Sequence, residues 1–214
     1  MNIAKEIEKD KYKIEIYYDD CPGNPREEWD NLGNMICWHR RYNLGDKHSY
    51  SEPRDFIYEL CRDFHDTQKM IDNYDYNLSE EEFINKYLSI LEKHIVILPL
   101  YLYDHSGITI NTTGFSCPWD SGQIGWIYAT KEKMKKEYGW KCWSKKREER
   151  IIDYLKAEVE TYDCYLTGNI YGFFLYKNDK EIDSCCGFYG SDFNTNGMLD
   201  AIKENIKDIQ TLED

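Results

Sequence analysis

Two short segments hold the densest group of side chains that could do chemistry. Residues 103–107 (YDHSG) and 117–123 (CPWDSGQ) bring a thiol, an imidazole and two carboxylates to strand ends or loops. A cysteine nucleophile needs an imidazole within hydrogen-bond reach and a third group that orients the ring. Cys117 could be the nucleophile and His105 its base, with Asp104 or Asp120 as the orienting group. This combination predicts a Cys/His-dependent hydrolase or transferase.

The same residues also have an ordinary structural interpretation. The sequence contains no G-x-S-x-G element and no family-specific cysteine signature. Residues 104–107 suit a hairpin turn, and residues 118–122 would form a rigid loop with Trp119 packed inward. We therefore expect no catalytic residues and keep the Cys117 site as an alternative.

Metal and cofactor sites are also candidates in principle. His39, Asp46 and His48 are suitable ligand types for a divalent ion, but they lack the H-E-x-x-H spacing, and the sequence contains no EF-hand loop. No Walker A or G-x-G-x-x-G motif is present. The eight cysteines are spread along the chain without a C-x-x-C pair, which favours reduced and mostly buried thiols. We expect neither a metal nor a cofactor.

The charge of the chain is large and unevenly distributed. Its 27 Lys and Arg against 40 Asp and Glu give −13, and the long-range field opposes sequence-independent binding to DNA or RNA. Residues 131–150 are the exception, because nine basic and four acidic side chains give this window +5 and leave −18 elsewhere. Trp140 and Trp143 lie inside the window, and basic residues interleaved with aromatic ones can bind phosphates. Two solvated helix faces with i,i+4 ion pairs would explain the same pattern.

Hydrophobic periodicity predicts the elements that must position these residues. Alternating or continuous apolar residues, bounded by turn residues, predict strands at 12–18, 34–40, 95–103, 107–113, 123–129, 170–177 and 182–189. Caps and 3.6-residue periodicity predict helices at 53–64, 79–94, 130–139, 144–168 and 198–212, with 65–78 as a surface connection. The order β-β-α-α-β-β-β-α-α-β-β-α favours an α+β fold with a mostly antiparallel sheet and flanking helices.

Length and composition predict a single globular domain over 1–214, in which 131–167 could form a peripheral helical element. Of the 214 residues, 41% are hydrophobic, which is enough for a sizeable core. The N-terminal MNIAKEIEKD lacks the apolar segment of a signal peptide, and the longest apolar run covers only 95–102. We therefore expect a cytoplasmic protein that does not engage a membrane.

Several segments resemble a family of small soluble proteins encoded by phages, plasmids and low-GC bacteria. They are 29–48 (WDNLGNMICWHRRYNLGDKH), 98–139 (LPLYLYDHSGITINTTGFSCPWDSGQIGWIYATKEKMKKEYG), 158–173 (EVETYDCYLTGNIYGF) and 185–190 (CCGFYG). The resemblance covers about 20–190 and implies no catalytic residues. It implies a context, because small acidic proteins of mobile elements often inhibit host defence.

The leading functional hypothesis is a non-enzymatic phage or mobile-element accessory protein in the host bacterial cytoplasm. Like an anti-CRISPR protein, it would bind and inhibit a host antiviral defence complex, its acidic surface mimicking nucleic acid in a basic groove. It would not bind nucleic acid sequence-specifically. The residues expected at the binding surface are Asp19, Asp20, Trp29, Asp30, Trp119, Asp120, Trp140 and Trp143. Besides the Cys/His enzyme, a sponge for a nucleotide second messenger, with a cavity that includes residues of 131–150, is an alternative.

Overall fold

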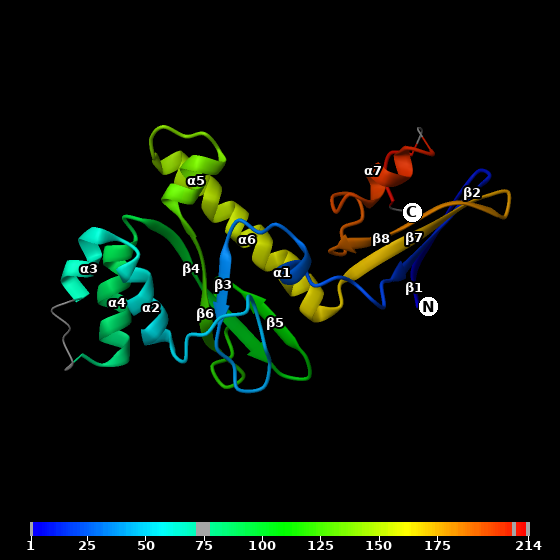
Figure 1. The fold of residues 1–214 in the computed structure, drawn as a ribbon. Coiled ribbons are helices and arrows are strands. Elements are labelled where there is room, and N and C mark those ends of the chain that lie inside the picture. The colour runs from blue at the N-terminus through cyan, green and yellow to red at the C-terminus, as the bar shows by residue number, and fades with distance from the viewer. Residues whose placement is uncertain (1, 72–77, 207–208, 213–214) are drawn as a thin grey trace. The chain divides into compact units, whose positions relative to one another are not determined.

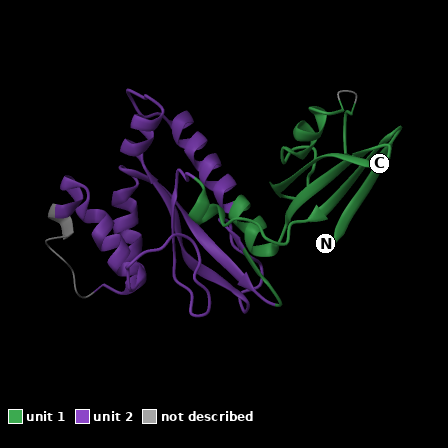
Figure 2. Cartoon of the chain, turned by 45° about the vertical axis from the view of Figure 1, so that its right-hand side comes forward, with its two compact units in different colours: residues 1–29, 106–109, 160–214 green, residues 30–105, 110–159 purple. Residues whose placement is uncertain are grey.

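A computed structural model describes residues 2–71, 78–206 and 209–212 and shows an α+β protein (Figure 1). The strands form two four-stranded antiparallel sheets beside the helices, which confirms the predicted α+β class. The contacts divide the chain into two compact units (Figure 2): unit 1 comprises 1–29, 106–109 and 160–214, and unit 2 comprises 30–105 and 110–159. The single domain over 1–214 stays a prediction, since one domain can contain two compact units.

Unit 1 is an antiparallel sheet with one apolar face. Its elements are β1 (Ile3–Lys9), β2 (Tyr12–Tyr18), α1 (Pro25–Glu28), β7 (Ile170–Lys177), β8 (Lys180–Tyr189) and α7 (Met198–Lys203). The strand order is β1-β2-β7-β8. Alternate strand residues pack against apolar residues of α7 and of the segment after it, and the core contains Ile7, Ile14, Ile16, Tyr171, Phe173, Leu175, Met198, Leu199, Ile202, Ile206, Ile209 and Leu212. Asn178 and Asp179 have positive φ (50° and 64°), which gives the tight turn between β7 and β8 the twist of a hairpin.

Unit 2 combines the second sheet with helices. Its elements are β3 (Asn34–Cys37), α2 (Pro53–Arg62), α3 (His65–Ile71), α4 (Glu80–Leu91), β4 (Ile95–Asp104), β5 (Ile108–Asn111), β6 (Ser121–Thr130), α5 (Lys131–Glu137) and α6 (Lys145–Thr167). The first half of β5 and the last turns of α6 belong to unit 1. The strand order is β3-β6-β4-β5, so β6 is an inner strand. Phe56, Phe83, Tyr87 and Trp126 are the large side chains of a core that α2 and α4 share with the sheet.

Local sequence signals account for several helix ends. Ser79 Oγ accepts a hydrogen bond from the Glu82 amide (3.3 Å), and the Glu82 carboxylate accepts one from the Ser79 amide (2.9 Å), which forms the predicted capping box. Thr130 caps α5 by accepting from the amide of Lys133 (3.2 Å). Gly168, with φ +72°, follows the last residue of α6.

Five elements correct the sequence-based expectation. β1, α1 and α3 are missing from the predicted order: only Ile7 of β1 is buried, and helices of four and seven residues are too short for a periodic signal. α3 occupies part of the expected connection at 65–78, of which 72–77 lies outside the described residues. The final helix ends at Lys203 rather than at 212, although the apolar residues after it are buried. β3 ends at Cys37, three residues before its predicted end.

The cysteines are more exposed than expected. Cys37 and Cys61 are buried, Cys117 and Cys164 are half-buried, and Cys21, Cys142, Cys185 and Cys186 are exposed. The prediction of mostly buried thiols is therefore wrong, because the exposed ones lie in loops and on β8, an edge strand.

Within the described part of the chain, no helix has both the length and the apolar character to cross a bilayer.

The buried Cys61 thiol and the half-buried Tyr128 phenol make the stability of the fold decrease at alkaline pH. Burial raises the pKa of Cys61 from 9.0 to about 12 and that of Tyr128 from 10.0 to about 12. The folded protein therefore keeps protons that the unfolded chain releases above about pH 9. Their stabilisation is complete below about pH 9 and is lost as the pH rises toward about 12.

We expect the free energy of unfolding in urea to fall steadily above about pH 9. Cys61→Ala should make this fall shallower, by at most about 1.4 kcal/mol per pH unit, because it removes one of the retained protons. Cys21→Ala, at an exposed thiol, is the control and should keep the wild-type slope. A flat profile above pH 9, or an unchanged slope in Cys61→Ala, would contradict the assignment.

Candidate functional site

The two segments with the candidate catalytic residues meet at one end of the sheet in unit 2. β4 and β6 are antiparallel neighbours, and Tyr103 lies opposite Ser121. The amide of Asp104 donates to the carbonyl of Asp120 (2.8 Å), so the pairing continues one residue before β6 begins. Both aspartates therefore lie at the same end of the sheet.

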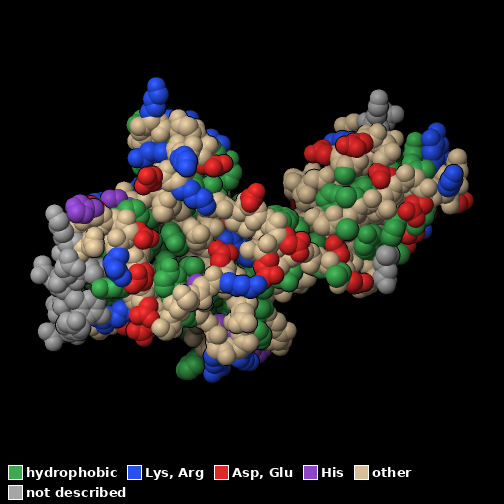
Figure 3. Space-filling view, viewed as in Figure 1, with side chains coloured by type: hydrophobic (Ala, Val, Ile, Leu, Met, Phe, Trp, Pro, Cys, Tyr) green, Lys and Arg blue, Asp and Glu red, His purple; other side chains and the backbone are tan. Residues whose placement is uncertain are grey.

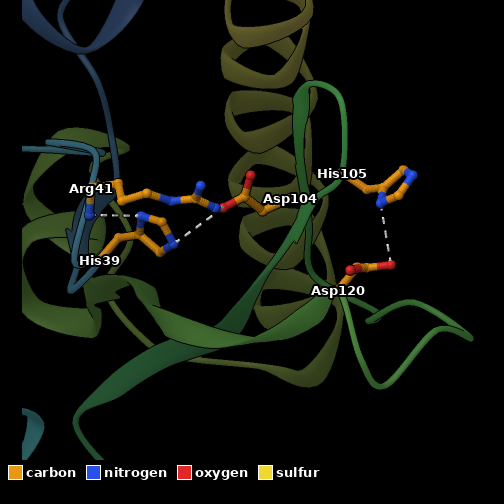
Figure 4. A network of polar contacts seen from close by, with 5 residues as sticks. All are labelled: His39, Arg41, Asp104, His105 and Asp120. Atoms are coloured by element: carbon orange, nitrogen blue, oxygen red, sulfur yellow. Dashed lines mark hydrogen bonds and ion pairs between the residues drawn. The ribbon is translucent and has the colours of Figure 1, made fainter.

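The Asp104 side chain anchors the loop that follows β3. Its carboxylate accepts a hydrogen bond from the Arg41 guanidinium, and His39 Nε2 lies 3.8 Å from Asp104 Oδ2 (Figure 4). His39 Nδ1 accepts from the backbone amide of Arg41 (3.4 Å), and the Tyr42 ring stacks on the imidazole with 5.1 Å between centroids. Because Nδ1 is engaged by the backbone, it is not available as a base. His39 therefore positions the loop.

The Asp120 side chain contacts two other candidate catalytic residues, Cys117 and His105. Its Oδ2 lies 3.5 Å from Cys117 Sγ. The same oxygen lies 3.5 Å from His105 Nδ1 (Figure 4). The structure thus brings three of the four predicted residues together and separates Asp104 from them. In a site with a cysteine nucleophile, the imidazole contacts the thiol and the carboxylate orients the ring. Here the Asp120 carboxylate lies between the thiol and the ring. The Cys117 thiol donates to Asp120, so the imidazole is not the group that receives its proton.

Trp119 lies in the loop between β5 and β6 and is 92% exposed. The expectation that it packs inward is wrong. Polar contacts close this turn instead: Ser121 Oγ donates to the Cys117 carbonyl (2.5 Å), and the Cys117 thiol contacts Asp120. The turn needs no contribution from the indole, which is left in solvent.

A pocket of about 370 Å³ lies between the two loops. The side chains that give it chemical character are His39, Arg40, Arg41, Asp104, Trp119 and Asp120. Two arginines, two carboxylates and an exposed indole at one rim match the composition of protein-binding surfaces, where Trp and Arg are enriched. We call this set the Trp119 surface. Arg41 and Tyr42 are absent from the predicted site: the HRRY run is visible in the sequence, but its pairing with Asp104 is not.

The other predicted binding residues fall into both units. Asp19, Asp20 and Trp29 belong to unit 1, and Asp30 belongs to unit 2. Trp29 is 49% exposed and packs edge-on against Tyr189, with 4.9 Å between ring centroids. Asp20 and Asp30 are exposed, and Asp19 accepts from the amide of Cys21 (3.1 Å).

Trp140 and Trp143 follow α5, which begins where β6 ends. They lie at the end of β6 opposite to Trp119, so the predicted residues of unit 2 form two separate surfaces. The indole of Trp143 donates to Glu148 (2.9 Å), and Lys131 Nζ covers its ring at 5.3 Å. Trp143 is therefore engaged within the protein and does not match the exposed anchor that the sequence predicts.

Two of the residues considered as metal ligands form hydrogen bonds with backbone groups. His48 Nε2 is 2.9 Å from the carbonyl of Cys37, and Asp46 accepts from the amide of Met35 (2.7 Å). His39 is directed to Asp104 instead. In the described ranges, no group of three or more His, Cys, Asp or Glu side chains is arranged to hold a metal ion.

Comparison of the chain with protein-family models, curated proteins and solved structures gives no match.

Proposed function

We propose that this protein is a non-enzymatic binding protein that recognises a macromolecular partner through the Trp119 surface. The observation that carries the proposal is the 92% exposure of Trp119 beside a pocket with two arginines and two carboxylates. An indole held in solvent by a closed polar turn is the kind of side chain that becomes an energetic centre of an interface.

The distribution of charge supports a partner with a basic surface. Unit 1 contains nine Lys and Arg against 19 Asp and Glu, a net charge of −10, whereas unit 2 has −3. An acidic unit of this kind would steer the protein toward a basic groove and fix its orientation there. With the resemblance to proteins of mobile elements, this favours inhibition of an antiviral defence complex.

Phage plating tests this proposal in cells. The full chain would be expressed in bacterial strains that each contain one antiviral nucleoprotein complex, and the efficiency of plating of a sensitive phage would be measured. We expect plating to rise in at least one strain, and the purified complex from that strain to bind the chain less tightly as salt is raised. Unchanged plating in every strain would contradict inhibition, and salt-independent binding would contradict the electrostatic part.

The proximity of Cys117 and His105 to Asp120 keeps a Cys/His-dependent hydrolase or transferase as the second candidate, although the thiol contacts the carboxylate and not the imidazole. Cys117→Ala separates the two functions. A binding protein keeps its effect on plating when the thiol is removed, whereas an enzyme that uses Cys117 loses it.

A further inference from the structure

A second surface of unit 2 combines arginines with stacked aromatic rings. It consists of Tyr138 and Trp140, which follow α5, and of Arg147, Arg150 and Tyr154 on the first turns of α6. The three α6 residues recur at spacings of three and four, so they lie on one face of the helix. We call these five residues the α5–α6 patch. Figure 3 shows Lys and Arg side chains gathered over this part of the molecule.

Guanidinium groups and rings lie against one another in the α5–α6 patch. Tyr138 stacks on Trp140 (4.7 Å, 20°) and is nearly parallel to Tyr154 (6.2 Å, 16°). Arg147 lies 5.0 Å from the Trp140 centroid, and Arg150 lies 5.0 Å from Tyr138 and 5.4 Å from Tyr154. Contact with a ring face restricts the guanidinium, which is therefore preorganised before a ligand arrives.

The charges of these two arginines are not neutralised by carboxylates. Across the described ranges of the chain, no Asp or Glu oxygen lies within ion-pair distance of Arg147 or Arg150. Arg147 donates to the carbonyl of Cys142, and Arg150 donates to Tyr154 Oη (3.0 Å). That hydrogen bond holds the pKa of the Tyr154 phenol below its usual value. Lys131, by contrast, pairs with Glu148 at 3.4 Å.

We propose that the α5–α6 patch binds the phosphate backbone of single-stranded nucleic acid. A guanidinium fork matches the geometry of phosphate oxygens, and the lysines of 131–150 add to the positive charge of the same segment. Ring faces and guanidinium planes also offer stacking positions to unpaired bases, which an acidic peptide lacks. The nucleic acid therefore uses both features of the patch, and the binding is independent of base sequence.

The acidic remainder of the chain does not prevent this binding at physiological ionic strength. Exposed charges are screened over about 8 Å at 0.15 M salt, so phosphates in contact with the patch respond mainly to the local charge of +5 in residues 131–150. The net charge of −13 slows the approach of a polyanion but does not exclude it from the patch. The net charge therefore opposes binding of nucleic acid to the rest of the protein but not to the α5–α6 patch.

Binding of a fluorescent oligothymidylate of about 20 nucleotides to the full chain, followed by anisotropy from about 50 to 200 mM salt, tests the proposal. We expect Arg147→Gln with Arg150→Gln to weaken binding at least tenfold and to reduce the slope of log affinity against log salt by about 1.4, the value for two lost single-strand phosphate contacts. Arg62→Gln with Lys180→Gln removes the same charge from exposed positions outside the patch and should change affinity less than twofold.

Three outcomes would overturn the assignment. They are no binding to the oligonucleotide at about 50 mM salt, an equal loss of affinity in both double variants, and displacement of the oligonucleotide by polyglutamate at an equal concentration of charge. A duplex of the same length that binds as tightly as the single strand would overturn the choice of unpaired bases. Because the α5–α6 patch and the Trp119 surface lie at opposite ends of β6, Trp119→Ala should leave oligonucleotide binding unchanged.

Discussion

Replacing Trp119 with alanine should weaken binding to the partner complex by about 30- to 700-fold, the equivalent of about 2–4 kcal/mol for a central interface residue. The side chain is 92% exposed in the free protein, so its removal costs the fold almost nothing. In the complex, the indole would lose nearly all of its contact with water. Truncation therefore acts on the complex alone.

Titration calorimetry measures the affinity of each variant, and the thermal unfolding midpoint measures its stability. Together they separate a loss of binding from a loss of folding. Trp119→Phe should lose less than Trp119→Ala because it keeps an aromatic ring. Ile182→Ala truncates another exposed apolar side chain, in unit 1, and should bind as the wild type does. Wild-type affinity in Trp119→Ala, or an equal loss in Ile182→Ala, would contradict a localised anchor.

Gly125→Ala should destabilise the protein by about 3 kcal/mol or more. Gly125 lies on the inner strand β6, and a Cβ atom there would overlap with the backbone carbonyl oxygen of Ile36 on β3. The obstacle is backbone, which cannot rotate away as a side chain can. β3 must therefore separate from β6, and the loop with His39 and Arg41 follows directly after β3.

Urea unfolding of Gly125→Ala against Gly122→Ala measures this effect on one strand. Nothing lies within 4 Å of the Cβ position of Gly122, so alanine there should be nearly neutral or slightly stabilising. Comparable loss in the two variants would show that the close approach of β3 and β6 is not the cause. A stable Gly125→Ala would contradict the described packing.

The elements that the sequence predicts well are those with local signals. β7 is found at its predicted bounds because it is an apolar run between a glycine-terminated helix and a hairpin turn. The helix that begins after Ser79 is encoded by its capping box. β1 carries no comparable signal, because its place beside β2 buries Ile7 while the other residues of the strand are exposed or half-buried.

The candidate site shows the same division between local and distant contacts. Cys117 and Asp120 are three residues apart, and their proximity follows from the turn itself. The pairing of Arg41 with Asp104 joins positions 63 residues apart and depends on the order of strands in the sheet. Whether Trp119 is buried or exposed depends on which contacts close the loop, and a sequence pattern does not contain that information.

In the proposed complex, Trp119 becomes buried against the partner. The most direct measurement is ¹⁹F NMR of the protein labelled with 5-fluorotryptophan, with the Trp119 signal assigned from Trp119→Phe. On addition of the defence complex identified by plating, the account predicts that this signal shifts and loses its H₂O/D₂O solvent isotope effect. A bound protein whose Trp119 signal keeps its position and its solvent isotope effect would contradict the account.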